Sequence, residues 1–382
     1  MKVSIDTRTL EHGDVYIPVK GESFDGRDFI DEAIQKGASR IVDEDIGVFA
    51  SKYRRRLQCP VIGVTGSFGK TTAKNMLQSV LSQSKRVHAT QSNQNNEIGV
   101  PLTVLGADAS TDVAIVEMGM RRKGEIAYLT RIVRPTHVVI TGVGLSHVEF
   151  FDHPKQIAHA KSEIFKSKLK WEPENSRYAF LPTHDPYYDL MAAKATAVGY
   201  KILPFVSGKG VESNIDLCYA VGRHFGLSDA QIQSGIQTYV PEQHRLVRYA
   251  LNQGVSLIDD TYNANPDGMR YALGVLKRFK GRKIAVLGDM LELGQFSTSA
   301  HLALEDAIID SEVDVLFTLG DAISVLNDTS LPVTHFQTKS QLISALCSEL
   351  RDGDALLVKG SRGLKMDDVV NAVIIEVGLD GH

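Results

Sequence analysis

Cysteine and long apolar runs are scarce in this 382-residue chain. Its three cysteines, Cys59, Cys218 and Cys347, lie far apart and form no Cys-x-x-Cys pair. This spacing argues against a paired-cysteine zinc site and against a disulfide-stapled fold. No apolar run approaches the roughly 18 residues of a membrane span, and the first ten residues lack the charged-then-apolar order of a signal peptide. We therefore expect a cytoplasmic protein that does not enter a membrane.

The chain also lacks an excess of positive charge. Its formal net charge is −4, with 23% charged residues, so a broad basic surface for nucleic acid is not expected and any phosphate recognition should be local. The one dense basic run, Arg54-Arg55-Arg56, is predicted to be a solvated face. The hydrophobic content of 43% is enough for more than one core.

Two series of short apolar runs alternate with helical patterns, which is typical of parallel strands buried in doubly wound α/β sheets. The first series comprises residues 61–65, 113–119 and 137–144. The second comprises residues 255–259, 283–289, 314–320 and 355–360. Residues 239–249 lie between the series as a plausible hinge. We predict a small N-terminal domain (1–58), a central domain (59–243) and a C-terminal domain (244–382).

The stretch "VIGVTGSFGKTT" (61–72) predicts a strand, a tight loop and a helix start. Gly66-Ser67-Phe68-Gly69 forms the loop, whose glycines permit close approach to phosphate oxygens. Lys70 adds a charge near the terminal phosphates, and Thr71, followed by Thr72, can place a hydroxyl on Mg²⁺. The subsequent apolar stripe at helical spacing supports this interpretation; its members are Ala73, Met76, Leu77, Val80 and Leu81. The common pattern has glycine where this chain has Val64, and the loop alone fits a kinase, a switch or a ligase.

Three side chains sit unusually for a core. Glu117 ends one apolar run and His147 comes after the next, so both are predicted at the carboxyl ends of neighbouring strands, where α/β sheets bind ligands. They are either strand-end caps or ligands of the cation that accompanies ATP. Lys161 falls on the apolar face of its helix, four residues after Ile157. It either extends to water past its neighbours or is held desolvated and neutral, able to react with CO₂ to give a carbamate that would serve as a metal ligand.

The second series carries polar strand ends of its own. "IDDTYNANPDGM" places Asp259 and Asp260 at a strand end, with Pro266 as the first residue of a helix. Such Asx-rich turns are commonly only turns. Lys359 and Arg362 come after the last run, where they face either an anionic substrate or water.

Together these motifs resemble the Mur ligases, most closely the branch that adds D-alanyl-D-alanine to UDP-N-acetylmuramoyl-tripeptide. Nine motifs occur in family order: "DTRTLEHGDVYIPVKGESFDGRDFIDEAI", "VTGSFGKTT", "NQNNEIGVPLT", "VEMGMRRKGEIAYLTRIVRP", "GVGLSHVEFF", "AKSEIF", "LIDDTYNANPDGM", "IAVLGDMLELG" and "LLVKGSRGLKMDDVV". The resemblance implies three domains: a small N-terminal α/β domain, a phosphate-loop central domain and a Rossmann-like C-terminal domain. It also accounts for Val64, because the family loop is Gly-x-x-Gly-Lys-Thr.

The reaction implied by the resemblance is ATP-dependent amide formation. ATP phosphorylates a carboxylate, an amine attacks the acyl phosphate, and ADP and phosphate leave. Lys70 and Thr71 would bind phosphate and the first Mg²⁺, whereas Glu117, His147 and a carbamylated Lys161 would hold a second.

Nucleotide and substrate residues are likewise implied by motif position. Asn214, opening the helix "NIDLCYAVGRHFGL", would contact adenine, and Arg245, Asp260 and Asn263 belong to the C-terminal groups expected to reach the nucleotide. The substrate residues begin with the uridine group, Asp6, Thr7, Arg8 and the segment 24–29 with Asp25. The sugar-peptide group is Asn95 and Asn96, and the third group is Lys359 and Arg362. Neither nucleic acid nor membrane is expected as a partner, and the chain is expected to be a monomer.

The chain departs from the family pattern in several places. It is shorter than usual, especially before "DTR" and between Lys161 and Asn214, and "PEQHRL" stands where Pro-Gly-Arg-Leu is expected. Phe68 replaces a common asparagine. These departures leave open a ligase for another carboxylate and amine, or a nucleotide-binding paralogue without catalysis. A small-molecule kinase would leave Lys161 and "DDTYNANP" unexplained.

Overall fold

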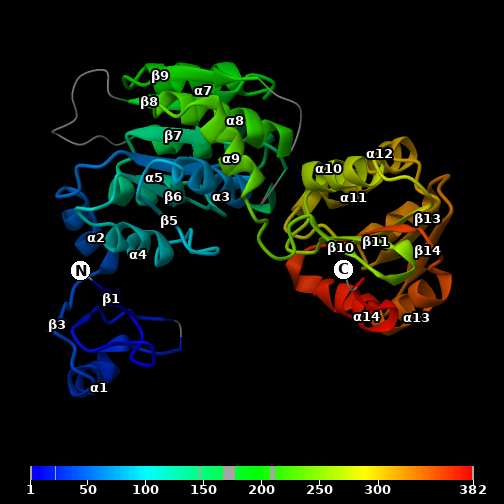
Figure 1. Cartoon of the computed structure of the whole chain (residues 1–382), viewed down its shortest axis with the longest axis horizontal. Coiled ribbons are helices and arrows are strands. Elements are labelled where there is room, and N and C mark those ends of the chain that lie inside the picture. The colour runs from blue at the N-terminus through cyan, green and yellow to red at the C-terminus, as the bar shows by residue number, and fades with distance from the viewer. Residues whose placement is uncertain (1, 22, 146–147, 167–176, 207–210, 381–382) are drawn as a thin grey trace. The chain divides into compact units, whose positions relative to one another are not determined.

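The computed structural model describes residues 2–21, 23–145, 148–166, 177–206 and 211–380. The chain divides into two compact units, which Figure 1 shows as ribbons. The first unit comprises residues 1–143 and 155–239, and the second comprises residues 144–154 and 240–382. Each unit is built around a six-stranded sheet.

The sheet of the first unit is parallel throughout and has the order β5-β6-β4-β7-β8-β9. Its strands are β4 (Val61–Thr65), β5 (Val87–Ala89), β6 (Val113–Glu117), β7 (His137–Ile140), β8 (Tyr178–Pro182) and β9 (Lys201–Phe205). The three predicted strands of this series are confirmed. However, β6 and β7 are not neighbours as expected, because β4 lies between them and pairs with both. The strand that leads into the phosphate loop therefore runs between the strands that precede Glu117 and His147.

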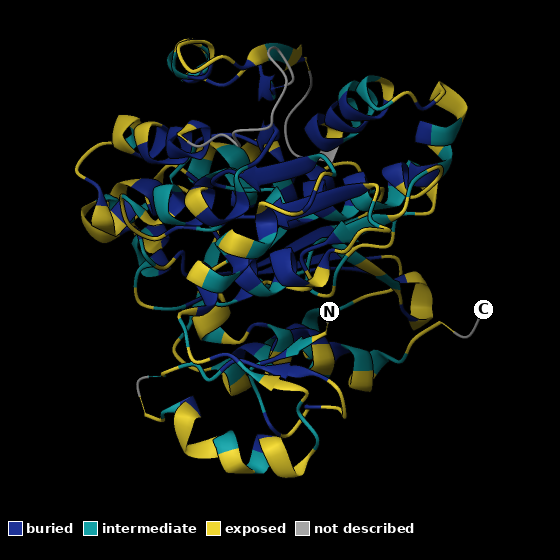
Figure 2. Cartoon of the chain, turned by 90° about the vertical axis from the view of Figure 1, so that its left-hand side faces the viewer, coloured by how far each residue is buried: buried dark blue, intermediate teal, exposed yellow. Residues whose placement is uncertain are grey.

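Helices cover the sheet of the first unit. They are α3 (Lys70–Leu81), α4 (Gly99–Gly106), α5 (Glu125–Val133), α6 (Pro154–Lys161), α7 (Tyr188–Thr196), α8 (Val211–His224) and α9 (Asp229–Gln237). The predicted stripe of α3 is buried and packs in one cluster with Leu217 and Val221 of α8 and Ile232 of α9. The central strands β4, β6 and β7 are buried along their whole length, and Figure 2 shows exposed residues on the outward faces of the helices.

The described residues up to position 58 form a small three-stranded parallel sheet, two α-helices and one 3-10 turn. The strands are β1 (Val3–Ser4), β2 (Val15–Tyr16) and β3 (Arg40–Ile41), and the helices are α1 (Ile30–Gln35) and α2 (Ile46–Arg54). The core of this sheet is small, with Leu10, Tyr16 and Ala33 as its buried members. A core of this size gives little independent stability, so packing on a larger body is expected.

The prediction of a solvated basic run is confirmed for Arg55 and Arg56, which are exposed, but it is wrong for Arg54 at the end of α2. Its side chain is fully buried. The guanidinium donates to the carbonyl oxygens of Val133 (2.7 Å), Leu57 (2.8 Å) and Arg134 (3.2 Å). Two of these carbonyls belong to the end of α5, where the helix dipole favours a cation.

The sheet of the second unit has the order β10-β11-β15-β12-β13-β14. Its strands are β10 (Val247–Ala250), β11 (Ser256–Asp260), β12 (Lys283–Gly288), β13 (Val315–Leu319), β14 (Val333–Phe336) and β15 (Ala355–Lys359). Only β10 is antiparallel to its neighbour among these strands. The flanking helices are α10 (Pro266–Leu276), α11 (Ser297–Leu302), α12 (Glu305–Asp310), α13 (Lys339–Glu349) and α14 (Asp367–Val377). Pro266 is the first helical residue, as predicted, and Asn265 caps the helix.

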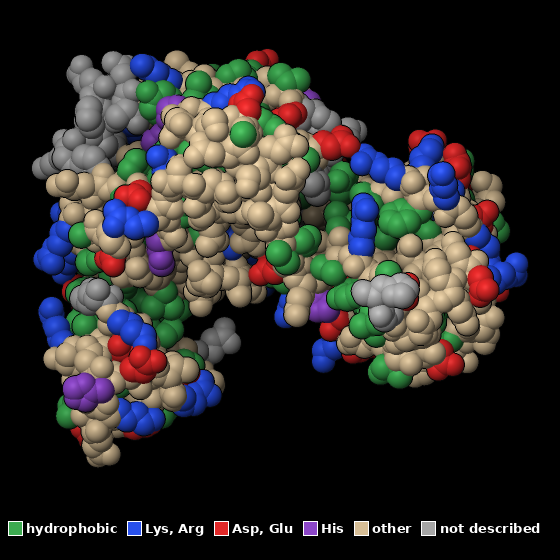
Figure 3. Space-filling model, viewed as in Figure 1, with side chains coloured by type: hydrophobic (Ala, Val, Ile, Leu, Met, Phe, Trp, Pro, Cys, Tyr) green, Lys and Arg blue, Asp and Glu red, His purple; other side chains and the backbone are tan. Residues whose placement is uncertain are grey.

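Charges of both signs are interspersed on the face of each unit that Figure 3 presents. Across the described ranges, no helix is long and apolar enough to cross a membrane. The three cysteines are free thiols.

Candidate active site

The phosphate loop is fixed by the end of the neighbouring strand β7. Ser67 N donates to the carbonyl of Gly142 at 2.8 Å, and Thr141 Oγ1 donates to the carbonyl of Phe68 at 2.5 Å. A side chain at Gly66 would place its Cβ 2.0 Å from Thr141 Oγ1. Gly66 is therefore required by close packing, as well as by the approach of phosphate that the sequence predicted.

The second glycine of the loop starts helix α3. Gly69 has φ 71°, a left-handed conformation that favours glycine. Lys70 Nζ donates to the carbonyl of Gly66 at 2.9 Å, so its ammonium group lies over the loop. Asn214 lies on the other side of Gly69: its amide nitrogen is 3.5 Å from where a Cβ on Gly69 would be. Asn214 is buried in α8 as its fourth residue, so the expectation that it opens this helix is wrong.

Glu117 ends β6 inside the protein, with no exposed surface. Its Oε1 accepts hydrogen bonds from Thr71 Oγ1 (3.2 Å) and Asn95 Nδ2 (2.8 Å). Its Oε2 is buried and, among the residues that the structure describes, has no hydrogen-bond partner. A buried carboxylate oxygen without a partner is costly unless a cation binds it. Thr71 and Glu117 were assigned to different Mg²⁺ ions, but the structure places their side chains in contact, and the chemistry of both oxygens fits a Mg²⁺ site.

Lys161, the last residue of α6, is 2% exposed. Extension to water, one of the two alternatives, is thus excluded. Burial, and secondarily the positive charge of Lys70, place the pKa of Lys161 well below its usual value. Lys161 is therefore close enough to Lys70 of the phosphate loop for the two charges to repel each other, and the neutral form of the Lys161 amine is favoured.

The remaining predicted metal ligand, His147, lies outside the described residues. Within the described part of the chain, no three His, Cys, Asp or Glu side chains converge on one point. The set of metal ligands therefore stays a prediction.

In the second unit, buried Lys359 at the end of β15 pairs with partly buried Asp260 at the end of β11. Lys359 Nζ lies 2.5 Å from Asp260 Oδ2 and donates to the carbonyl of Asn263 at 2.9 Å. Asp260 Oδ1 also accepts from Leu246 N at 3.2 Å. Since Lys359 is only 3% exposed, the alternative that it faces water is wrong.

Arg245 and Arg362 meet at one aromatic ring. The guanidinium carbon of Arg245 is 3.7 Å from the ring centre of Tyr262, and that of Arg362 is 5.2 Å from it. Arg245 also pairs with Glu242 at 3.2 Å. Two cations on one ring make this strand end attractive to an anion.

The residue before Arg245 explains how the chain accommodates "PEQHRL" in place of Pro-Gly-Arg-Leu. His244 has φ 64°, a left-handed conformation that is uncommon for a side chain larger than glycine. Its Nδ1 is 2.8 Å from Asp259 Oδ2, and Asp259 is fully buried. This hydrogen bond offsets part of the backbone cost.

The predicted uridine residues lie in turns beside the small N-terminal sheet: Asp6, Thr7 and Arg8 follow β1, and Asp25 comes just before a 3-10 turn. Arg8 pairs with Asp6 at 2.6 Å, and its hydrogen bonds lower the pKa of Asp6 to about 2. Thr7 is buried. Asp25 caps a short 3-10 turn by accepting from Arg27 N at 3.0 Å.

Asn95 and Asn96 were both predicted to contact the sugar-peptide portion of the substrate, but in the structure they have different hydrogen-bond partners. Asn95 contacts Glu117, whereas Asn96 Oδ1 accepts a hydrogen bond from the backbone N of Gly99, the first residue of α4, at 2.9 Å. The Asn95 contact was missed because the two residues are distant in sequence. Tyr262 and Thr141 were also missed, although each lies within or beside a family motif.

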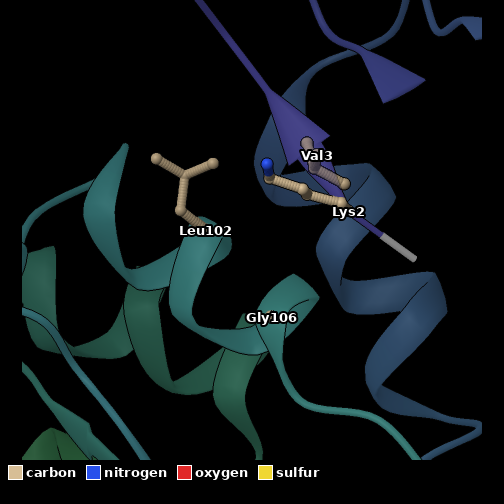
Figure 4. Close-up of a pocket in the computed structure, with 4 residues that line it drawn as sticks. All are labelled: Lys2, Val3, Leu102 and Gly106. Atoms are coloured by element: carbon tan, nitrogen blue, oxygen red, sulfur yellow. The ribbon is translucent and has the colours of Figure 1, made fainter. Parts of the chain in front are cut away.

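A cavity of about 320 Å³ lies away from these residues. It is lined by Lys2, Val3, Leu102 and Gly106. Figure 4 shows Lys2 and Val3 at β1 facing Leu102 on α4. None of the predicted site residues lines it, so we place the chemistry at the phosphate loop.

Family models place this site in a known class. The Mur ligase middle domain matches residues 64–238, the glutamate ligase domain of Mur ligases matches 244–362, and a Mur ligase family catalytic domain matches 2–68. The chain belongs to the Mur ligase family, and it is an enzyme of the ATP-dependent, ADP-forming amide ligase type.

Its relatives point to one branch of that family. The chain is 32% identical to UDP-N-acetylmuramoyl-tripeptide–D-alanyl-D-alanine ligase of Bacillus subtilis, covering 97% of this chain and 93% of the relative. It is 33% identical to the enzyme of the same name from Synechocystis (98% and 92%). The first alignment spans 424 positions, more than the 382 residues here, so the relative carries segments that this chain lacks.

Solved structures agree with the fold. MurF from Acinetobacter baumannii has a TM-score of 0.87 at 26% identity, covering 98% of this chain and 93% of that one. MurF ligase from Thermotoga maritima in complex with ADP has a TM-score of 0.83 at 26% identity, with 98% and 97% covered. The predicted three-part α/β architecture is confirmed.

Proposed function

We propose that this enzyme adds D-alanyl-D-alanine to UDP-N-acetylmuramoyl-tripeptide, using ATP, in the synthesis of peptidoglycan precursors. One observation supports this most strongly. Glu117 contacts Thr71, at the start of the helix after the phosphate loop, and its second carboxylate oxygen has no hydrogen-bond partner among the described residues. That arrangement suits a nucleotide bound with a cation. The substrate names come from the relatives.

ATP would bind along the loop through Gly66, Ser67, Gly69, Lys70, Thr71 and Thr72. The backbone N–H groups at the start of α3, the helix dipole and the charge of Lys70 would attract the phosphates. We assign Asn214 to adenine because it is buried beside Gly69. Asp260, Asn263 and Arg245 are assigned to the nucleotide by their motif positions.

Mg²⁺, when bound, would neutralise charge on the transferring phosphoryl group. Thr71 would hold the first ion, and Glu117, His147 and Lys161 would hold a second. We propose that Lys161 is carbamylated: its neutral amine attacks CO₂, a nitrogen–carbon bond forms, and one proton is released to solvent. The product is an anionic carboxylate in place of a cation. Burial favours this modification because it keeps the amine unprotonated.

The chain's own residues would then guide two transfers. Lys70 holds the phosphate while the tripeptide carboxylate attacks it, giving an acyl phosphate and ADP. The amine of D-alanyl-D-alanine attacks the acyl carbon, and phosphate leaves. Exclusion of water from the buried end of β6 protects the acyl phosphate.

Substrate contacts are assigned by motif. Asp6, Thr7, Arg8 and Asp25 would meet the uridine nucleotide, Asn95 and Asn96 the sugar-peptide portion, and Lys359 and Arg362 the remaining anionic groups. For Lys359, burial against Asp260 favours an indirect part. We further propose domains at 1–58, 59–243 and 244–382, and a cytoplasmic monomer that binds neither nucleic acid nor membrane.

The test is direct. Purified protein is incubated with ATP, Mg²⁺, UDP-N-acetylmuramoyl-tripeptide and D-alanyl-D-alanine, and both phosphate release and product mass are measured. The proposal is supported if phosphate release requires both the tripeptide and D-alanyl-D-alanine. The product should then be heavier than the tripeptide substrate by the two alanine residues. Phosphate release that continues when either the tripeptide or D-alanyl-D-alanine is left out contradicts it.

A further inference from the structure

Glu163 lies two residues after Lys161, in the motif "AKSEIF", and neither transfer step uses it. Its side chain is almost completely buried, at 5% exposure. It belongs to the 3-10 turn Ser162–Phe165, which continues directly from α6. A buried carboxylate at this position needs partners.

The partners of Glu163 are backbone groups of another helix. Its Oε2 accepts from Gly124 N at 3.1 Å and from Ala127 N at 3.2 Å. Gly124 is the N-cap of α5, has no side chain and adopts φ 93°. The N-cap residue of α5 therefore has no side chain that could cap the helix. Glu163, from a different segment, supplies the capping carboxylate, and the helix dipole favours an anion at this end.

Glu163 is not the counter-ion of Lys161. Residues two apart on a helical segment point in different directions, and Lys161 forms none of the ion pairs found among described residues. Among those ion pairs, the partner of Glu163 is Lys166, whose Nζ lies 3.6 Å from Glu163 Oε1. The Lys166 side chain is mostly exposed. The negative charge of Glu163 is therefore directed at α5 rather than at the lysine amine.

This cap connects two segments that carry candidate metal ligands. The loop from Met118 to Gly124 begins immediately after Glu117 and ends at the capped residue. The segment from Lys161 to Glu163 ends at the capping residue. We propose that Glu163 is a positioning residue, whose carboxylate holds the Glu117 loop and the Lys161 segment in register. The metal-related half of this inference rests on the proposed function.

The experiment compares Glu163→Ala, Glu163→Gln and a matched control, Ser228→Ala. Ser228 caps α9 in the same unit by accepting from Gln231 N at 3.3 Å, so its loss also removes a helix cap. Hydrogen–deuterium exchange of the nucleotide-free protein is measured over residues 118–127 and 155–166. Glu163→Ala should speed exchange about tenfold in both segments. Glu163→Gln retains an acceptor oxygen and should restore most of the protection, whereas Ser228→Ala should act only near 229–232.

A kinetic arm tests the metal-related half. For Glu163→Ala we expect kcat to fall about tenfold and the Mg²⁺ concentration at half-maximal rate to rise several-fold, with KM for ATP little changed. Ser228→Ala should leave all three values near wild type. Faster exchange at 124–127 alone, with 155–166 unchanged, overturns the proposal and leaves Glu163 as a simple cap. If wild type performs no ligation while exchange couples the two segments, the proposed function fails and the positioning role stands.

Discussion

Both sheets carry buried charged side chains at the carboxyl ends of their strands, but the two ends differ in how those charges are satisfied. In the first unit, Glu117 leaves one oxygen without a partner among described residues, and Lys161 is buried with a lowered pKa. In the second unit, Lys359 pairs with Asp260 and His244 with Asp259. At the first strand end, Glu117 needs a bound cation to satisfy its second oxygen, whereas the carboxylates of Asp259 and Asp260 at the second already have side-chain partners. The second strand end still offers Arg245 and Arg362 to an anion.

The largest effect should come from Glu117→Gln. The amide retains an oxygen for Thr71 and Asn95 but removes the charge, so we expect kcat for ligation to fall on the order of 10³-fold. Because an unpaired buried charge is also removed, the thermal midpoint should stay level or rise. Phosphate release and calorimetry measure the two quantities. Activity within tenfold of wild type would mean that this carboxylate binds no essential cation.

Lys161→Ala should reduce turnover by about 10²-fold, because the proposed carbamate is lost with the amine. Short carboxylates such as acetate should restore part of the rate by occupying the vacated space. The matched measurement uses Lys74→Ala, which removes a different buried lysine, on α3. Acetate rescue that is equal in both variants would argue against a carbamate at Lys161.

In the second unit the corresponding change should act on stability. Asp260→Asn leaves the ammonium group of Lys359 buried beside a neutral amide, so we expect about 3 kcal/mol of destabilisation. The double variant with Lys359→Met should recover much of that loss. Denaturant unfolding of wild type, the two single variants Asp260→Asn and Lys359→Met, and the double variant gives the coupling energy. Additive losses would mean that the pair contributes no interaction of its own.

The amino end of the first sheet provides a pH comparison. His137 is buried with its Nε2 3.0 Å from His224 Nε2, and burial, then His224, lowers the pKa of His137 to about 3. The unfolded chain binds a proton near pH 6.5 and the folded chain does not, so stability is lost as pH falls from 6.5 toward 3. Between pH 6.5 and 5 we expect a loss of about 2 kcal/mol. The free energy of unfolding, measured across this range for wild type and His137→Gln, should fall less steeply in the variant.

The smallest effect is expected at Tyr262. Tyr262→Leu removes the ring on which Arg245 and Arg362 lie, which should raise KM for an anionic substrate about threefold. Tyr262→Phe keeps the ring and should change KM little. Steady-state titration of ATP and of the dipeptide shows which substrate responds. Equal behaviour of the two variants would mean that the ring plays no part in binding.

Local features of the sequence predicted much of this molecule. The strands were readable because runs buried on both faces are almost wholly apolar, and the phosphate loop was readable because its glycines and Lys70 are contiguous. Lys161 was found because helical spacing places it on an apolar face. Each of these signals lies within about ten residues.

Features that depend on distant pairings were not readable. The order of strands places β4 between β6 and β7, which chain order does not reveal. Arg54 was predicted to be exposed because a charged run normally is, but carbonyls about 80 residues away at the end of α5 satisfy it. Asn95 reaches Glu117 across a loop for the same reason.

Helix α5 meets buried charges of opposite sign at its two ends, Glu163 at the first turn and Arg54 at the last. Each residue added to an α-helix rotates the remainder of the helix by about 100° and shifts it by about 1.5 Å. A single insertion or deletion within α5 would therefore misalign one end whenever the other is in place. The number of residues in α5 is thus constrained more tightly than the identity of its exposed residues. Exposed positions of α5 should accept many substitutions, but insertions and deletions within the helix should not be tolerated.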